Sequence, residues 1–181
     1  MTSIARGLAR WAVYLGLSLG LLACSTPDVS TYAEQTPKLD LRQYFNGPVR
    51  AYGMFQDRSG EIVRRFEVDI TSTWTGNQGT LDERFVYADG STQRRVWRLT
   101  LGPDGAVQGT ADDVVGTAQG RIAGNTMNWR YTLSLPVDGT VYEVQFDDWL
   151  VLMDERVMLN RATMSKFGIS LGEVTLTFVK P

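Results

Sequence analysis

The side chains of this sequence that could support acid–base or metal chemistry are almost all carboxylates. Its 181 residues include 20 aspartates and glutamates, a single cysteine and no histidine. A Ser-His-Asp or Cys-His arrangement, a histidine-bearing zinc site and a haem histidine are therefore excluded for this chain. A lone thiol forms neither an internal disulfide nor a thiolate cluster. We expect a protein that is not an enzyme and that uses no catalytic residue, metal or cofactor.

Carboxylates gather at two adjacent pairs, Asp112-Asp113 and Asp147-Asp148. A two-carboxylate glycosidase needs its carboxyls to face each other across ~5 to 9 Å. Neighbours on a strand point to opposite faces, so Asp147 and Asp148 on a strand would form no such dyad. The other pair lies between predicted strands. There we favour turn hydrogen bonds over a hard-cation site, because the ligand spacing of an EF-hand is missing.

Turn signals divide the chain after residue 38 into short segments. They are built on glycine, asparagine and aspartate, as in Asp57-Arg58-Ser59-Gly60 and Val137-Asp138-Gly139, which are the residues that hairpin turns favour. The segments between them are about 8 to 13 residues long and alternate apolar with polar positions, as strands do. The clearest expected buried faces are Ile62, Phe66, Val68, Ile70 and Trp74, and Tyr142, Val144, Phe146, Leu150 and Leu152.

This pattern predicts an all-β domain, an antiparallel meander of about eight to ten strands. A meander of that size loses its exposed edges when it closes, so we expect a calycin-like, lipocalin-style barrel. A two-layer antiparallel sandwich is the alternative. The segment from Leu39 to Phe45 is expected to form a short helix or turn that plugs one end.

The same alternation places four charged residues on inward faces. Arg64 falls on the face of Phe66, Glu83 on that of Phe85 and Tyr87, Arg95 on that of Trp97, and Asp148 on that of Phe146. Two are positive and two are negative, which suits burial because an unpaired buried charge is very costly. We expect a charge-balanced cluster inside the barrel, with a tyrosine such as Tyr87, or Asn160, adding hydrogen bonds.

Two interpretations of this cluster remain open. It could position the polar head of a mostly apolar ligand, such as a lipid. It could instead be an ion-pair network that only fixes the register of the strands. The outward Asp147 and Trp149 suggest a rival role: an exposed tryptophan can anchor a protein or membrane contact, which would make the protein an envelope scaffold with a filled barrel. Alternatively, the N-terminal segment covers Trp149.

The N-terminus has the composition of a signal peptide. Arg6 and Arg10 are the only charges in residues 1–23, and the apolar run from Trp11 to Leu22 follows them. A run of about 12 residues is too short to span the ~30 Å hydrocarbon core as a helix. Leu21-Leu22-Ala23-Cys24 matches the lipobox of bacterial lipoproteins, so we expect cleavage before Cys24 and acylation, for example with palmitate, of that cysteine.

These features predict three segments: a signal peptide at 1–23, the acylated Cys24 with a flexible tether at 24–38, and one barrel domain at 39–181. Ser25 rather than aspartate follows the cysteine, which favours the periplasmic face of the outer membrane. The formal net charge of −2, without a basic patch, gives no indication of nucleic-acid binding. The expected partners are the membrane, through Cys24, and a small apolar ligand or an envelope protein.

The chain also resembles a family of bacterial lipoproteins catalogued as domain of unknown function 3833. The resemblance covers nearly the whole domain and is carried by Asn46 to Gly53, Arg64-Arg65-Phe66, Leu81 to Phe85, Arg95-Val96-Trp97, Gly109 to Gly116, Phe146 to Trp149, Asn160-Arg161-Ala162 and Lys166-Phe167-Gly168. It implies an envelope lipoprotein and adds no activity.

Overall fold

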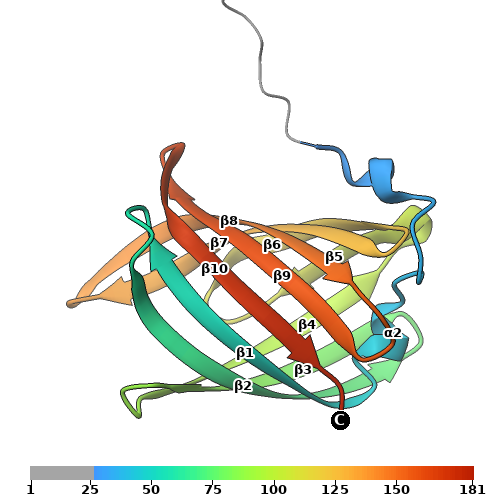
Figure 1. Cartoon of the computed structure of the whole chain (residues 1–181), viewed down its shortest axis with the longest axis horizontal. Helices are drawn as coiled ribbons and strands as arrows, with labels where there is room; N and C mark the ends of the chain where they lie inside the picture. Colours follow the sequence, from blue (N-terminus) through green and yellow to red (C-terminus); the bar gives the residue numbers. More distant parts are fainter. Residues whose placement is uncertain (1–26) are drawn as a thin grey trace, which may run out of the picture.

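The computed structural model describes residues 27–181. The predictions of a signal peptide and of acylation at Cys24 lie outside the described residues. Ten antiparallel strands form a closed barrel in which each strand pairs with its neighbours in the chain, and β1 also pairs with β10 (Figure 1). The strands are β1 Gly47–Asp57, β2 Ile62–Thr75, β3 Gln78–Tyr87, β4 Thr92–Leu101, β5 Ala106–Thr110, β6 Val114–Ala123, β7 Thr126–Val137, β8 Thr140–Leu152, β9 Val157–Lys166 and β10 Ile169–Val179.

The predicted meander and lipocalin-style barrel are therefore confirmed, and the alternative of a two-layer sandwich is wrong. In residues 27–181 no helix is both long enough and apolar enough to cross a membrane.

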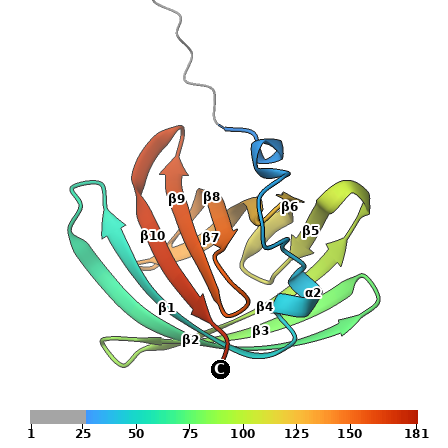
Figure 2. The same ribbon diagram turned by 45° about the vertical axis from the view of Figure 1, so that its right-hand side comes forward.

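The two ends of the barrel differ. The turns β1–β2, β3–β4, β7–β8 and β9–β10 lie at one end, which we call the open end, and helix α2, Leu41–Tyr44, lies at the other, the closed end (Figure 2). The Asp40 side chain caps α2 by accepting a hydrogen bond from the Arg42 N–H at 2.9 Å. The Tyr44 hydroxyl lies 3.1 Å from the carbonyl oxygens of both Arg156 and Phe178. The predicted plug is thus confirmed.

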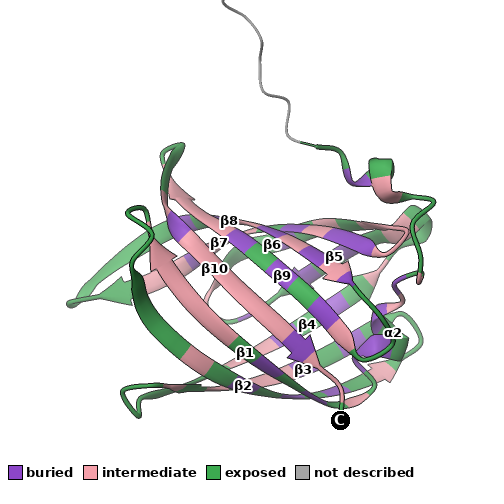
Figure 3. Ribbon diagram, viewed as in Figure 1, coloured by how far each residue is buried: buried purple, intermediate pink, exposed green. Residues whose placement is uncertain are grey.

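Burial increases from the open end toward α2. The residues that alternate inward near the closed end are almost fully buried, for example Val49 at 2% and Met158 at 0% exposure. The hairpins of the open end are exposed (Figure 3). Ile62 and Tyr142, predicted to be buried, are 51% and 41% exposed. That prediction is wrong because both residues lie near the turns of the open end. Alternation still determines the face of the strand on which each side chain lies, but at this level no packed interior lies opposite that face.

The N-terminal segment packs on the closed end of the barrel. A 3-10 helix, η1, Val29–Tyr32, contacts β6 and β7 and buries Val29. Gly124 approaches the segment so closely that a Cβ there would lie 1.8 Å from the Tyr32 carbonyl oxygen, and its φ of +59° also favours glycine. Leu39 donates its N–H to the Gly124 carbonyl at 2.8 Å. The expected flexible tether is therefore wrong from Asp28 onward, and the domain begins before residue 39.

Strand β5 is short, and this interrupts the barrel wall. It pairs with β4 only from Arg98 to Leu101, so among the described residues the open-end half of β4 has no backbone partner in β5. Side chains rather than a backbone ladder must join the wall at this level.

Candidate ligand-binding cavity

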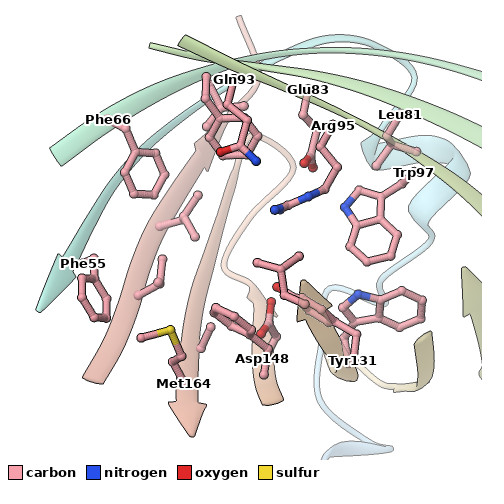
Figure 4. A pocket seen from close by; sticks show the side chains of 18 of the residues that line it. Phe55, Phe66, Leu81, Glu83, Gln93, Arg95, Trp97, Tyr131, Asp148 and Met164 are labelled. Carbon is pink, nitrogen blue, oxygen red and sulfur yellow. The ribbon is translucent and has the colours of Figure 1, made fainter. Parts of the chain in front are cut away.

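A cavity of about 570 Å³ occupies the interior of the barrel, and its size falls within the range of small-molecule sites. Its walls are mostly apolar, and Figure 4 shows Phe55, Phe66 and Met164 facing it from the open-end half. At mid-depth the wall becomes polar. We call Glu83, Arg95, Asp113, Asp148 and Asn160 the polar cluster; of these, Glu83, Arg95 and Asp148 line the cavity directly.

The ion pair between Arg95 and Asp113 is the strongest polar contact of this cluster. Arg95 Nη2 lies 2.8 Å from Asp113 Oδ2, and its Nε lies 3.1 Å from Oδ1, so the pairing is bidentate. Their side chains are only 13% and 26% exposed. Burial, the largest single effect, would lower the pKa of Arg95, but the hydrogen bond with Asp113 and the charges of Tyr131, Glu83 and Asp113 together outweigh it, so the net shift is upward. The pair joins β4 to the β5–β6 turn, at the level where β5 no longer pairs with β4.

Asp148 is a buried carboxyl with an unmet acceptor. It is 6% exposed, and its Oδ2 accepts a hydrogen bond from Asn160 Nδ2 at 3.2 Å. Among the described residues neither Asp148 Oδ1 nor Asn160 Oδ1 has a hydrogen-bond partner. Burial raises the pKa of Asp148 to about 7, against the opposing effects of Asn160 and Arg95. The carboxyl therefore changes its charge near neutral pH.

Glu83 behaves in a similar way on the neighbouring wall. It stands opposite Arg95 in the β3–β4 ladder. Burial raises the pKa of Glu83 to about 7, although the Arg95 charge favours the ionised form. The cavity thus holds two carboxyls that are both close to half-ionised at neutral pH, which is uncommon for residues without a special environment.

An aromatic wall lies beside these carboxyls. Tyr131 stacks on Phe146 with ring centroids 5.1 Å apart, and its edge meets Trp97 at 5.4 Å. Trp97 in turn contacts Trp129 at 5.5 Å. Burial, followed by the Asp148 charge, raises the pKa of Tyr131, so its hydroxyl keeps its proton at neutral pH.

Arg64 and Tyr87 line the part of the cavity nearest the open end. Burial raises the pKa of the Tyr87 hydroxyl, which the charges of Arg95 and Asp113 also affect. The Arg64 side chain is 51% exposed, lies 3.6 Å from Asp89 and covers the Tyr87 ring at 4.2 Å from its centroid. The Tyr87 hydroxyl donates to Gln93 Oε1 at 2.8 Å. The prediction of a balanced cluster of four charges is wrong in this respect, since Arg64 has a partner of its own at the open end.

The structure brings Glu83, Arg95, Asp148 and Asn160 together and adds Asp113, which the sequence analysis assigned to a turn. Turn geometry does hold for its neighbour Asp112, whose side chain is 95% exposed. One signal could have identified Asp113: an arginine predicted to point inward, such as Arg95, needs an acidic partner when it is buried.

Asp147 and Trp149 lie on the outer face of β8. Asp147 accepts from Asn128 Nδ2 at 2.6 Å and from Arg130 Nε at 3.0 Å, so the pair Asp147-Asp148 forms no facing dyad. Trp149 is half-buried, and its ring meets the edge of Tyr32 at 6.0 Å. The N-terminal segment therefore covers Trp149, as in the alternative to a surface anchor. In residues 27–181 no three acidic, cysteine or histidine side chains are grouped so as to hold a metal ion.

The closed meander and its internal cavity define a calycin-like barrel protein. The S-type phycobiliprotein lyase CPES from Guillardia theta has a similar fold, with a TM-score of 0.60 at 8% sequence identity over 86% of this chain and 98% of the lyase. The chain belongs to the family described as "Protein of unknown function (DUF3833)", whose profile matches residues 18–180. The predicted resemblance is thereby confirmed.

Two further structures are more distant. Apocrustacyanin C1 matches with a TM-score of 0.40 at 16% identity, and apocrustacyanin C2 with 0.39 at 16% identity, each over 87% of this chain and 71% of the other. No curated protein matches the sequence.

Proposed function

We propose that this domain binds a small, mostly apolar molecule such as a lipid inside the barrel. The observation that carries the proposal is the cavity of about 570 Å³, with apolar walls and a few polar groups placed at one depth. Ligand pockets commonly combine an apolar lining with a small number of such groups, which orient the ligand. An ion-pair network that served only to fix the strand register would require no space beside it.

The open end supports the same function. Its hairpins carry exposed apolar side chains, among them Val141 at 62%, Phe167 at 88% and Ile169 at 60% exposure. Phe167 has a φ of +52°, a conformation that non-glycine residues rarely adopt. An apolar rim of this kind suits the passage of an apolar ligand into the barrel.

A variant that fills the cavity tests the proposal. The neutral fluorescent probe N-phenyl-1-naphthylamine is expected to bind the domain with increased emission, and Met164→Trp is expected to weaken binding by about tenfold or more because the indole occupies ligand space. The matched control is Leu159→Trp on the same strand, since Leu159 is 39% exposed and does not line the cavity. Unchanged emission with the wild-type protein, or equal losses in both variants, would contradict the proposal.

We also propose that the protein is held on the cell envelope, at the periplasmic face of the outer membrane, through lipid on Cys24. The lipobox Leu21-Leu22-Ala23-Cys24 and the following Ser25 support this proposal. The Cys24→Ser variant is expected to lose the incorporation of radiolabelled palmitate and to move from the membrane pellet to the soluble fraction. Retention of label in the variant would exclude Cys24 as the acylated residue.

The role we propose is binding rather than catalysis. The scaffold alternative depended on an outward Trp149, and that ring is engaged by Tyr32 within the chain. The raised pKa values of Glu83 and Asp148 have burial as their largest cause. A role in binding the polar group of a ligand accounts for the position of both carboxyls in the cavity wall.

A further inference from the structure

The polar cluster has more acceptors than donors. It contains three carboxyls, Glu83, Asp113 and Asp148, and one guanidinium, that of Arg95. Arg95 already directs its Nε and Nη2 at Asp113. Asp148 Oδ1 has no hydrogen-bond partner among the described residues, although the side chain is only 6% exposed. A buried acceptor of this kind is satisfied by a donor.

The position of the cluster also sets the direction of a ligand. Between the cluster and α2 the cavity is lined by nearly fully buried side chains, including Leu81 and Leu99. Between the cluster and the open end the wall is lined by half-buried apolar residues such as Phe55, Phe66 and Met164 (Figure 4). An apolar chain that lies along this open-end lining therefore places its polar head at the cluster.

We infer that the ligand is an amphiphile with a hydrogen-bond-donating head, an ammonium or a hydroxyl group, that binds with this head at Asp148, and that anionic head groups are rejected. This inference rests on the proposed function. A carboxylate or phosphate head would place a further negative charge beside three carboxyls and would leave Asp148 Oδ1 unsatisfied. An ammonium head makes a charge-assisted hydrogen bond with Asp148 and is also attracted by the negative charge of Glu83.

Arg64 does not reverse this selectivity. Its charge lies at the open end, half exposed and beside Asp89, where solvent screens it. An anionic ligand attracted there would still have to place its head or its chain against the polar cluster.

The test compares three probes with the same alkyl chain, namely decylammonium, decan-1-ol and decanoate, each competing with N-phenyl-1-naphthylamine below its micellar concentration at pH 8. We expect decylammonium to bind most tightly and decanoate at least about tenfold more weakly. Asp148→Asn is expected to reduce decylammonium affinity by about tenfold and to change decanol affinity little. Glu83→Gln provides a second, independent variant with the same expected pattern.

The matched control is Glu143→Gln, which removes one exposed carboxylate from the same strand as Asp148. It should leave the preference for decylammonium unchanged, which separates a local contact from the net charge of the protein. Decylammonium should also bind more tightly at pH 8 than at pH 6, because the alkylamine stays protonated while the cavity carboxyls ionise. The charged and polar groups around Asp148 are Arg95, Tyr131, Asn160, the outward Asp147 and Glu83, and of these Glu83 ionises over the same pH range.

The failures of the two proposals can be told apart. The inference is overturned if the naphthylamine and decanol bind but decanoate binds as tightly as decylammonium. It is also overturned if the preference for decylammonium is unchanged in both cavity variants. In either case the proposed function still stands. If neither the naphthylamine nor any alkyl probe binds, the proposed function is overturned and the inference with it.

Discussion

Replacing Asp113 with alanine is expected to lower the free energy of unfolding by about 3 kcal/mol, one of the two largest effects we anticipate for a single substitution. The Arg95 guanidinium is 13% exposed and forms a bidentate pair with Asp113. Without this partner the buried positive charge keeps its desolvation cost and loses its attraction. The effect should be larger at this position because the backbone ladder between β4 and β5 begins only at Arg98. Equilibrium urea denaturation measures it.

The neighbouring residue offers a matched control. Asp112→Ala removes the same side chain from a position that is 95% exposed and 3.5 Å from Arg98, so its stability should change by no more than about 0.5 kcal/mol. The double variant Arg95→Leu with Asp113→Leu should recover most of the loss, because no charge then remains unpaired. Equal effects of the Asp112 and Asp113 substitutions would show that the ion pair contributes nothing measurable.

The second large effect is on the pH dependence of stability. The pKa values of Asp148 and Glu83 rise from about 4 in the unfolded chain to about 7 in the fold. The folded state therefore binds more protons than the unfolded state between these values, and the free energy of unfolding falls as pH rises from about 4 to 7. Above pH 7 the loss is complete. Surface aspartates with a lowered pKa, such as Asp40 and Asp57, lose their contribution only at more acidic pH.

Asp148→Asn should remove a large share of this slope. The amide has nearly the same volume, carries no charge to desolvate and supplies a donor next to Asn160, so the variant should exceed the wild-type stability at pH 8 by about 3 kcal/mol. The control is Asp147→Asn, on the outer face of the same strand, which should keep the slope between pH 4 and 7. Thermal unfolding followed at pH 5, 6, 7 and 8 measures both; a wild-type curve that rises through this range would contradict the assignment.

Alternation along the strands allowed the inward side of Glu83, Arg95 and Asp148 to be predicted, because the side to which a residue points depends only on its own strand. Depth along the barrel could not be predicted in the same way. Arg64 lies on the expected face of its strand. It lies at the open end beside Asp89, however, because the strand extends beyond the packed interior. Sequence spacing along one strand contains no information on where the opposite wall ends.

Asp113 was missed for a different reason. Its contact with Arg95 depends on β5 ending at Thr110 and on the following turn reaching the open-end half of β4. This is a contact between segments 18 residues apart, and no local pattern marks it. The N-terminal segment was missed because only a few of its side chains are apolar and buried, chiefly Val29 and the half-buried Tyr32, within a stretch whose composition is that of a linker.

The docking of η1 on the closed end determines how the barrel would be presented to its surroundings. Asp28 is the fourth residue after Cys24, and such a chain reaches at most ~14 Å. With Cys24 acylated, as we propose, the closed ends of β6 and β7 would be held near the anchoring bilayer, and the apolar hairpins would point away from it (Figure 1). A cargo molecule would then be exchanged on the distal side, with a carrier or a membrane other than the one in which the protein is anchored.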